Sequence, residues 1–129
     1  MGITKQQLLN YRAIVREIAE IKNELETIGD VRASDYSAVR TGQRASLDNA
    51  IIRQENLLAF LRRKCERLEA ERVAIENAID QLDGDERLLI RYKYIVGMSW
   101  AQIQARLERE PDATFWLHRK TLKKLFELK

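Results

Sequence analysis

The sequence has very few of the residues on which metal, redox or covalent chemistry depends. Its 129 residues include one cysteine, Cys65, and one histidine, His118. A single cysteine excludes a disulfide framework within the chain, and one Cys with one His cannot supply a Cys-rich or His-rich zinc site. There is also no glycine-rich phosphate loop and no nucleophile motif. These absences predict a protein that is not an enzyme and uses no cofactor.

Glycine and proline are scarce as well, with five and one occurrences, and aromatic residues make up only 7% of the chain. Strand-rich folds need many turn residues and β-branched runs, so this composition predicts an all-helical fold. No apolar run approaches the ~20 residues that a membrane span requires, and no signal peptide is recognisable. We therefore expect a cytoplasmic protein that does not enter a membrane.

Charge is unevenly distributed along the chain, which is 33% charged and carries a net charge of +3. Residues 1–85 contain 13 Lys or Arg against 15 Asp or Glu, whereas residues 86–129 contain 10 against 5. The basic excess belongs to the last third. This predicts either a C-terminal part that faces a polyanion or a solvated basic surface.

Two segments show the 3.5-residue apolar period of a coiled coil. The first covers about 5–28, and Gly29 follows it where a helix C-cap prefers a left-handed residue. Its seam consists of Tyr11, Ile14, Ile18, Ile21, Leu25 and Ile28. The second covers about 46–82 and keeps the period over five heptads, with nine of eleven seam positions apolar. Its seam consists of Leu47, Ile51, Gln54, Leu58, Leu61, Cys65, Leu68, Arg72, Ile75, Ile79 and Leu82.

Residues 29–46 lack this period and are rich in Ser, Asp, Gly and Arg, which predicts a flexible loop. Arg32, Arg40 and Arg44 in this loop could instead touch nucleic acid. At 1.5 Å per residue the second helix spans on the order of 54 Å and the first roughly 36 Å, so the first cannot cover the second. We therefore expect a helical hairpin over residues 1–83 that forms a homodimer through its helices.

The tripeptide Asp83-Gly84-Asp85 predicts a domain boundary, with Gly84 ending the long helix and Asp85 capping the next one. The C-terminal domain, 85–129, is predicted to contain three short helices, over about 86–95, 99–107 and 111–125. Ser99 and Gln102 have the spacing of a capping box, and Pro111 suits the first position of the last helix. Two short helices joined by a tight turn and ending in a basic cluster are typical of a helix-turn-helix.

The segment ERLLIRYKYIVGMSWAQIQARL (86–107) resembles the start of the fourth conserved region of bacterial sigma factors. The matching positions are Arg91, Tyr92, Gly97, Ser99, Trp100, Ile103 and Leu107, and TLKKL (121–125) is similar to that region's ending. With its long helical N-terminal half, the chain resembles phage and prophage transcriptional regulators of the ArpU/RinA-like type. The resemblance implies a DNA-binding regulator of phage genes, with double-stranded DNA and RNA polymerase as partners.

The same resemblance assigns roles to residues of the last helix. By register, the residues that point at the major groove are Pro111, Asp112, Phe115 and Trp116. Aspartate can accept from cytosine N4, and Phe or Trp can contact a thymine methyl. Phosphate contacts fall to the nearby basic residues, which are Arg109, Arg119, Lys120, Lys123 and Lys124. Glu108 and Glu110 stand where the family usually has a glycine and a hydroxyl cap.

Two other interpretations stay open. The chain could be a helical scaffold or adaptor that binds a protein such as RNA polymerase through its seam or through Phe115 and Trp116. It could also be a small phage packaging subunit, although those usually place the DNA-binding module first. Among single residues, we expect Trp100 in the core, Cys65 in the seam and His118 at the surface.

Overall fold

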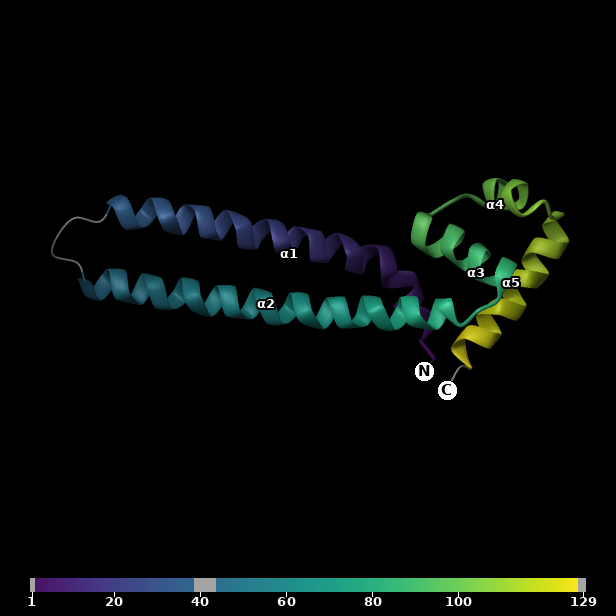
Figure 1. Cartoon of the computed structure of the whole chain (residues 1–129), viewed down its shortest axis with the longest axis horizontal. Coiled ribbons are helices and arrows are strands. Elements are labelled where there is room, and N and C mark those ends of the chain that lie inside the picture. The colour runs from purple at the N-terminus through teal and green to yellow at the C-terminus, as the bar shows by residue number, and fades with distance from the viewer. Residues whose placement is uncertain (1, 39–43, 128–129) are drawn as a thin grey trace. The chain divides into compact units, whose positions relative to one another are not determined.

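The computed structural model describes the backbone of residues 2–38 and 44–127, and the side chains of 2–28 and 47–127. All regular secondary structure in this part of the chain is helical, which confirms the predicted fold class. A pair of long helices is followed by a module of short ones (Figure 1). The elements are α1 (Lys5–Ala38), α2 (Arg44–Asp80), α3 (Gly84–Ile90), the π-helix η1 (Arg91–Val96), α4 (Trp100–Leu107) and α5 (Pro111–Phe126).

The chain divides into two compact units. One consists of Met1–Val15 with Ala70–Lys129, and the other of Arg16–Glu69. The first unit therefore holds the start of α1 and the end of α2 together with α3, η1, α4 and α5.

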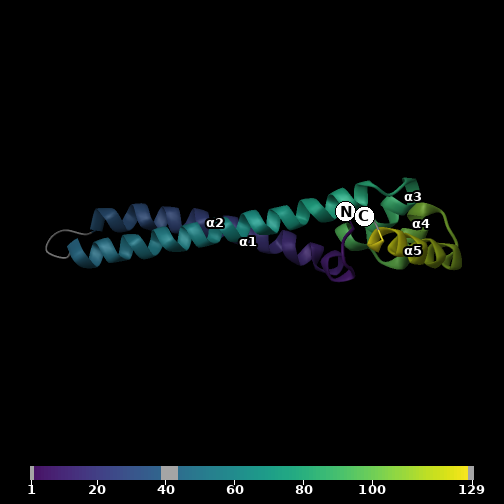
Figure 2. The same ribbon diagram turned by 90° about the horizontal axis from the view of Figure 1, so that it is seen from below.

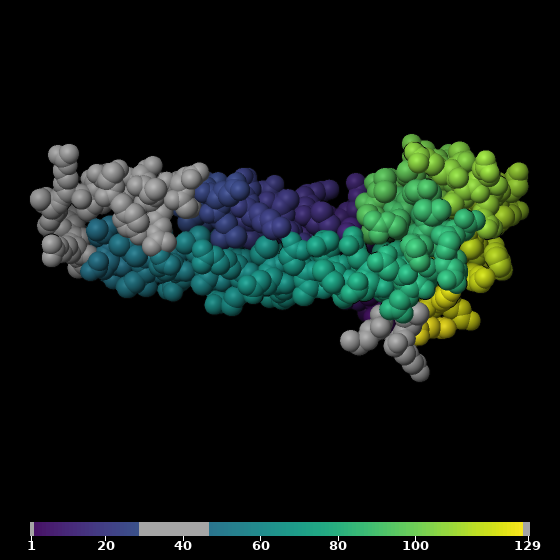
Figure 3. Space-filling model, in the orientation of Figure 1, coloured from purple at the N-terminus to yellow at the C-terminus, as the bar shows by residue number. Residues whose placement is uncertain are grey.

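In the Arg16–Glu69 unit, α1 and α2 lie side by side (Figures 1 and 2). Their atoms are in contact where the side chains are described (Figure 3). Ion pairs flank the interface, from Lys22 Nζ to Glu69 Oε1 at 3.2 Å and from Lys64 Nζ to Glu17 Oε1 at 2.8 Å. The predicted seams are confirmed, because every seam position of both helices is buried or half-buried.

The hairpin helices are longer than the sequence predicted. Helix α1 continues through Gly29 to Ala38 and α2 begins at Arg44, so the helix end at Gly29 and most of the predicted 29–46 loop are wrong. A single glycine costs a helix about 1 kcal/mol, which elongation of an established helix tolerates where no proline follows. Arg40 and the side chains of Arg32 and Arg44 lie outside the described residues.

The added length changes one inference. With 34 residues α1 is on the order of 51 Å long, against roughly 55 Å for the 37 residues of α2. A second subunit was expected because the first helix was predicted to be too short to cover the second. The two helices are of similar length, since α1 ends ten residues later than the sequence predicted. A homodimer therefore needs a different physical argument.

The unit that contains the C-terminal helices has its own apolar core, in which α3 packs against η1, α4 and α5. Tyr11 of α1 donates its hydroxyl hydrogen to Glu76 of α2 at the edge of this core. The largest fully buried side chains are Leu8, Ile75, Ile79, Leu82, Leu89, Ile90, Ile103, Thr114, Thr121 and Leu125. The buried threonines lie on the inner side of α5, and Thr114 donates its hydroxyl hydrogen to the Glu110 carbonyl at 3.0 Å.

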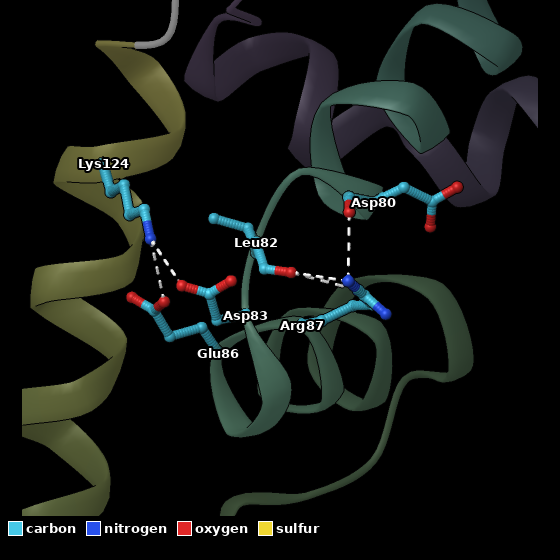
Figure 4. A network of polar contacts seen from close by, with 6 residues as sticks. All are labelled: Asp80, Leu82, Asp83, Glu86, Arg87 and Lys124. Carbon is cyan, nitrogen blue, oxygen red and sulfur yellow. Dashed lines mark hydrogen bonds and ion pairs between the residues drawn. The ribbon is translucent and has the colours of Figure 1, made fainter.

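The junction between α2 and α3 differs from the predicted one. Helix α2 ends at Asp80 and α3 begins at Gly84, so Asp83 occupies the N-cap position, without a side-chain cap hydrogen bond, and Asp85 is not the cap. Arg87 of α3 instead donates to the carbonyls of Leu82, at 2.8 and 3.2 Å, and of Asp80, at 3.1 Å (Figure 4). Arg87, which follows Leu82 by five residues and Asp80 by seven, thus satisfies the carbonyls that were expected to meet a glycine cap.

Candidate nucleic-acid interface

Helix α4 begins with the capping box that the sequence predicted. The Ser99 amide donates to Gln102 Oε1 at 3.0 Å, and the Gln102 amide donates to Ser99 Oγ at 3.3 Å. Two amide groups at the helix start are thereby satisfied. The helix ends at Leu107, as expected, with Ile103 fully buried and Trp100 half-buried.

The turn that joins α4 to α5 has an unusual backbone. Glu108 has φ 53° and ψ 45°, which is the left-handed conformation that glycine adopts most easily. Glu110 occupies the N-cap of α5 but makes no side-chain cap hydrogen bond, and Pro111 is the first helical residue, as predicted. The turn therefore has a glutamate in the left-handed conformation at the position that the resemblance assigns to glycine.

Helix α5 presents one continuous exposed surface, which we call the α5 face. It runs along the helix opposite the buried Thr114, Leu117, Thr121 and Leu125. Seven of the nine residues that the sequence selected for DNA contact are exposed on it: Pro111, Asp112, Phe115, Trp116, Arg119, Lys120 and Lys123. The face is apolar and acidic near the start of α5 and basic further along.

The other two selected residues are held by carboxylates of α3 and the residue before it. Arg109 donates to Asp85 Oδ2, with Nη2 at 2.9 Å and Nε at 3.3 Å. Lys124 Nζ lies 3.1 Å from Glu86 Oε1 and 3.4 Å from Asp83 Oδ2 (Figure 4). The hydrogen bond to Glu86 raises the pKa of Lys124. The charges of Arg109 and Lys124 are thus compensated by carboxylates of the same chain, which reduces what these residues can contribute to a phosphate contact.

The Glu86 carboxylate is itself buried, with an exposed fraction of 8%. Its second oxygen and the Thr121 hydroxyl are enclosed without a hydrogen-bond partner. Lys124 is therefore the partner that keeps a buried charge compensated between α3 and α5. We interpret Lys124 as a positioning residue for α5 rather than as a nucleic-acid contact.

An aromatic cluster lies beside the α5 face and includes one of its residues, Phe115. The Trp100 ring meets Phe115 edge-on at 5.2 Å between centroids and His118 edge-on at 4.8 Å. Tyr94 of η1 stacks on His118, and its hydroxyl lies 2.8 Å from His118 Nε2. These contacts join η1, α4 and α5 through their side chains.

His118 is half-buried, so its predicted place at the surface is wrong. The reason is that its ring lies between Tyr94 and Trp100, which are 24 and 18 residues away in sequence. Burial, and secondarily the charge of Lys93, lowers the pKa of His118 below its ordinary value of 6.5. The ring is therefore neutral at pH 7 and adds no positive charge to the α5 face.

Cations also lie over aromatic rings in this region, which sequence analysis missed. Lys93 Nζ lies 4.7 Å from the Trp100 ring centroid, and Lys120 Nζ lies 5.2 Å from that of Trp116. The i, i+4 spacing of Trp116 and Lys120 on one helix was the available signal for the second of these pairs. Such pairs contribute about 0.5–1 kcal/mol at exposed sites.

Several kinds of site are absent from the part of the chain that the structure describes. It contains no group of three or more His, Cys, Asp or Glu side chains that could hold a metal ion. None of the helices searched there combines the length and the apolar character needed to cross a membrane. Cys65 is a free thiol, half-buried in the seam of α2.

Comparison of the chain with protein-family models, with curated proteins and with solved structures gives no match. An assignment of function therefore depends on the geometry of α4 and α5 and on the residues that carry the resemblance to sigma factors.

Proposed function

We propose that this protein is a DNA-binding transcriptional regulator of phage or prophage genes, and that α5 enters the major groove of promoter DNA. The observation that carries the proposal is the α5 face, which is exposed along a helix that follows a tight turn. Arg119, Lys120 and Lys123 on this face form no ion pair within the described part of the chain. Free cations at that place can replace the counterions of DNA phosphates.

The order of side chains along α5 supports the same orientation. In a helix-turn-helix the start of the second helix contacts base edges, while residues outside the groove contact the backbone. Here Asp112, Phe115 and Trp116 lie near the start of α5, and the basic residues follow. Phosphate contacts set affinity and base-edge contacts set sequence preference, so the two parts of the α5 face have separable roles.

A homodimer is the second part of the proposal, and it is supported by the surface of α2. In the Arg16–Glu69 unit, Ile52, Leu57 and Phe60 are 56%, 45% and 54% exposed. Large apolar side chains gathered on one helix favour burial against another protein surface. A second copy of the chain would double the number of DNA contacts. A different protein partner on this surface is the alternative, and it corresponds to the adaptor interpretation.

The test begins with selection of duplex DNA from a random library by the purified protein. Binding to the selected duplex is then measured by fluorescence anisotropy across a series of KCl concentrations. The double variant Lys120→Ala with Lys123→Ala should bind less tightly, and its log–log salt slope should decrease by roughly two for each copy of the chain bound, since each phosphate contact contributes about 0.9.

The matched control is Arg16→Ala with Arg62→Ala, which removes the same charge from exposed positions of α1 and α2 away from Ile52, Leu57 and Phe60. It should leave the salt slope close to that of the parent. A lysine variant that binds with the parent's affinity and slope would refute the proposed docking of α5. If the parent selects no duplex even at low salt, DNA binding is refuted and the adaptor function takes its place.

A further inference from the structure

We infer that Trp116 detects thymine, by packing its indole ring against the 5-methyl group in the major groove. This inference rests on the proposed binding of α5 to DNA and specifies which chemical feature of the DNA the helix recognises. The observation behind it is that two large aromatic side chains are exposed to solvent. Trp116 is 59% exposed and Phe115 is 43% exposed on the α5 face. Both are among the exposed large apolar residues of the chain.

The methyl group of thymine fits this surface because of what base edges offer. In the major groove they present hydrogen-bond donors and acceptors, and the thymine methyl is the apolar feature among them. The tryptophan lies on the same exposed stripe as Asp112, one helical turn before it, and Arg119, three residues after it. An apolar contact at this position would therefore be flanked by a hydrogen-bond acceptor and by cations.

The two rings are held in place by neighbours. Phe115 meets the Trp100 ring edge-on at 5.2 Å, which anchors it to α4. Lys120 Nζ lies 5.2 Å from the centroid of the Trp116 ring. The same lysine is a phosphate-contact candidate, so the arrangement places a ring for a base edge beside a cation for the backbone.

This geometry favours contact of the Trp116 ring with a base edge over its contact with an unpaired base or with a protein partner. An unpaired base would stack on the indole plane, where it would compete with the Lys120 ammonium group for one face of the ring. A protein partner would favour a larger apolar patch, but the rings are bordered by Asp112, Arg119 and Lys120. The cations of the α5 face instead complement the phosphates of a duplex.

The experiment replaces each thymine of the selected duplex in turn by deoxyuridine, which lacks only the 5-methyl group. At a contacted position the parent should bind about fourfold less tightly, the loss expected for one buried methyl group. Trp116→Ala should lose this difference and bind both duplexes alike, while Trp116→Phe should keep part of it. Lys123→Ala is the matched control, and it should weaken binding to both duplexes while preserving their ratio.

Three outcomes would overturn the inference. A selected duplex whose binding is unchanged by uracil at every position would refute thymine detection but leave DNA binding intact. A uracil effect that persists in Trp116→Ala would assign detection of the methyl to another residue. Tighter binding to the isolated thymine-containing strand than to the duplex, lost in Trp116→Ala, would assign the ring to stacking on unpaired bases. Failure to select any duplex refutes the proposed function itself.

Discussion

Replacing Glu108 by glycine should stabilise the protein, because Glu108 has the left-handed backbone conformation in the turn between α4 and α5. The conformation costs an L-residue roughly 1–2 kcal/mol, and glycine avoids this cost. Glycine in turn loses more conformational entropy on folding, about 0.5–1 kcal/mol, so the net gain is about 1 kcal/mol. A gain of that size corresponds to roughly a fivefold shift in the folding equilibrium.

The measurement is urea unfolding followed by circular dichroism, with the midpoint expected to rise at an unchanged m-value. Glu108→Ala is the control, because it removes the same charge but retains the Cβ atom that causes the strain. The glycine variant should exceed the alanine variant by about 1 kcal/mol. Equal midpoints for the two variants would show that the turn does not hold this residue in the left-handed conformation.

Three further variants test other parts of the C-terminal unit. Ile103→Ala truncates a fully buried side chain of α4, so the free energy of unfolding measured in urea should decrease by about 2–5 kcal/mol. A decrease smaller than that caused by a substitution at an exposed site would contradict the burial of Ile103. Gly97→Ala should destabilise by at least about 1 kcal/mol, since φ is +86° and a Cβ atom would lie 2.3 Å from Arg12 Nη1. Adding Arg12→Ala to this variant should restore only the stability lost through the clash with Arg12. Full restoration would show that the backbone conformation at residue 97 does not contribute to the loss. Because the pKa of His118 is lowered in the folded state, the unfolded state binds more protons, and stability should fall as the pH drops through about 6.5 and below. In His118→Gln, the free energy of unfolding measured at several pH values should no longer show this decrease. If its pH dependence equals that of the parent, His118 is not the group responsible.

Features that depend on neighbours three or four residues apart were predictable from the sequence. The seam of α2 is one case, because the heptad spacing places its residues on one side of a helix whatever the helix packs against. The Ser99–Gln102 capping box and Pro111 at the start of α5 are others, since each depends only on its own helix terminus. For the same reason, helical register was enough to place Phe115, Trp116 and Lys120 on one face of α5.

Features that depend on the rest of a long helix or on a partner in another element were decided only by the tertiary structure. Helix α1 passes Gly29 because cooperative elongation outweighs the modest local cost of one glycine. Arg87 caps the end of α2, and Lys124 is held by Glu86 and so has its charge offset within the chain. His118 was expected in solvent, but contact with η1 and α4 buries it and lowers its pKa. Periodicity determines which side chains share a face, whereas burial, ion pairing and protonation depend on what the fold brings against that face.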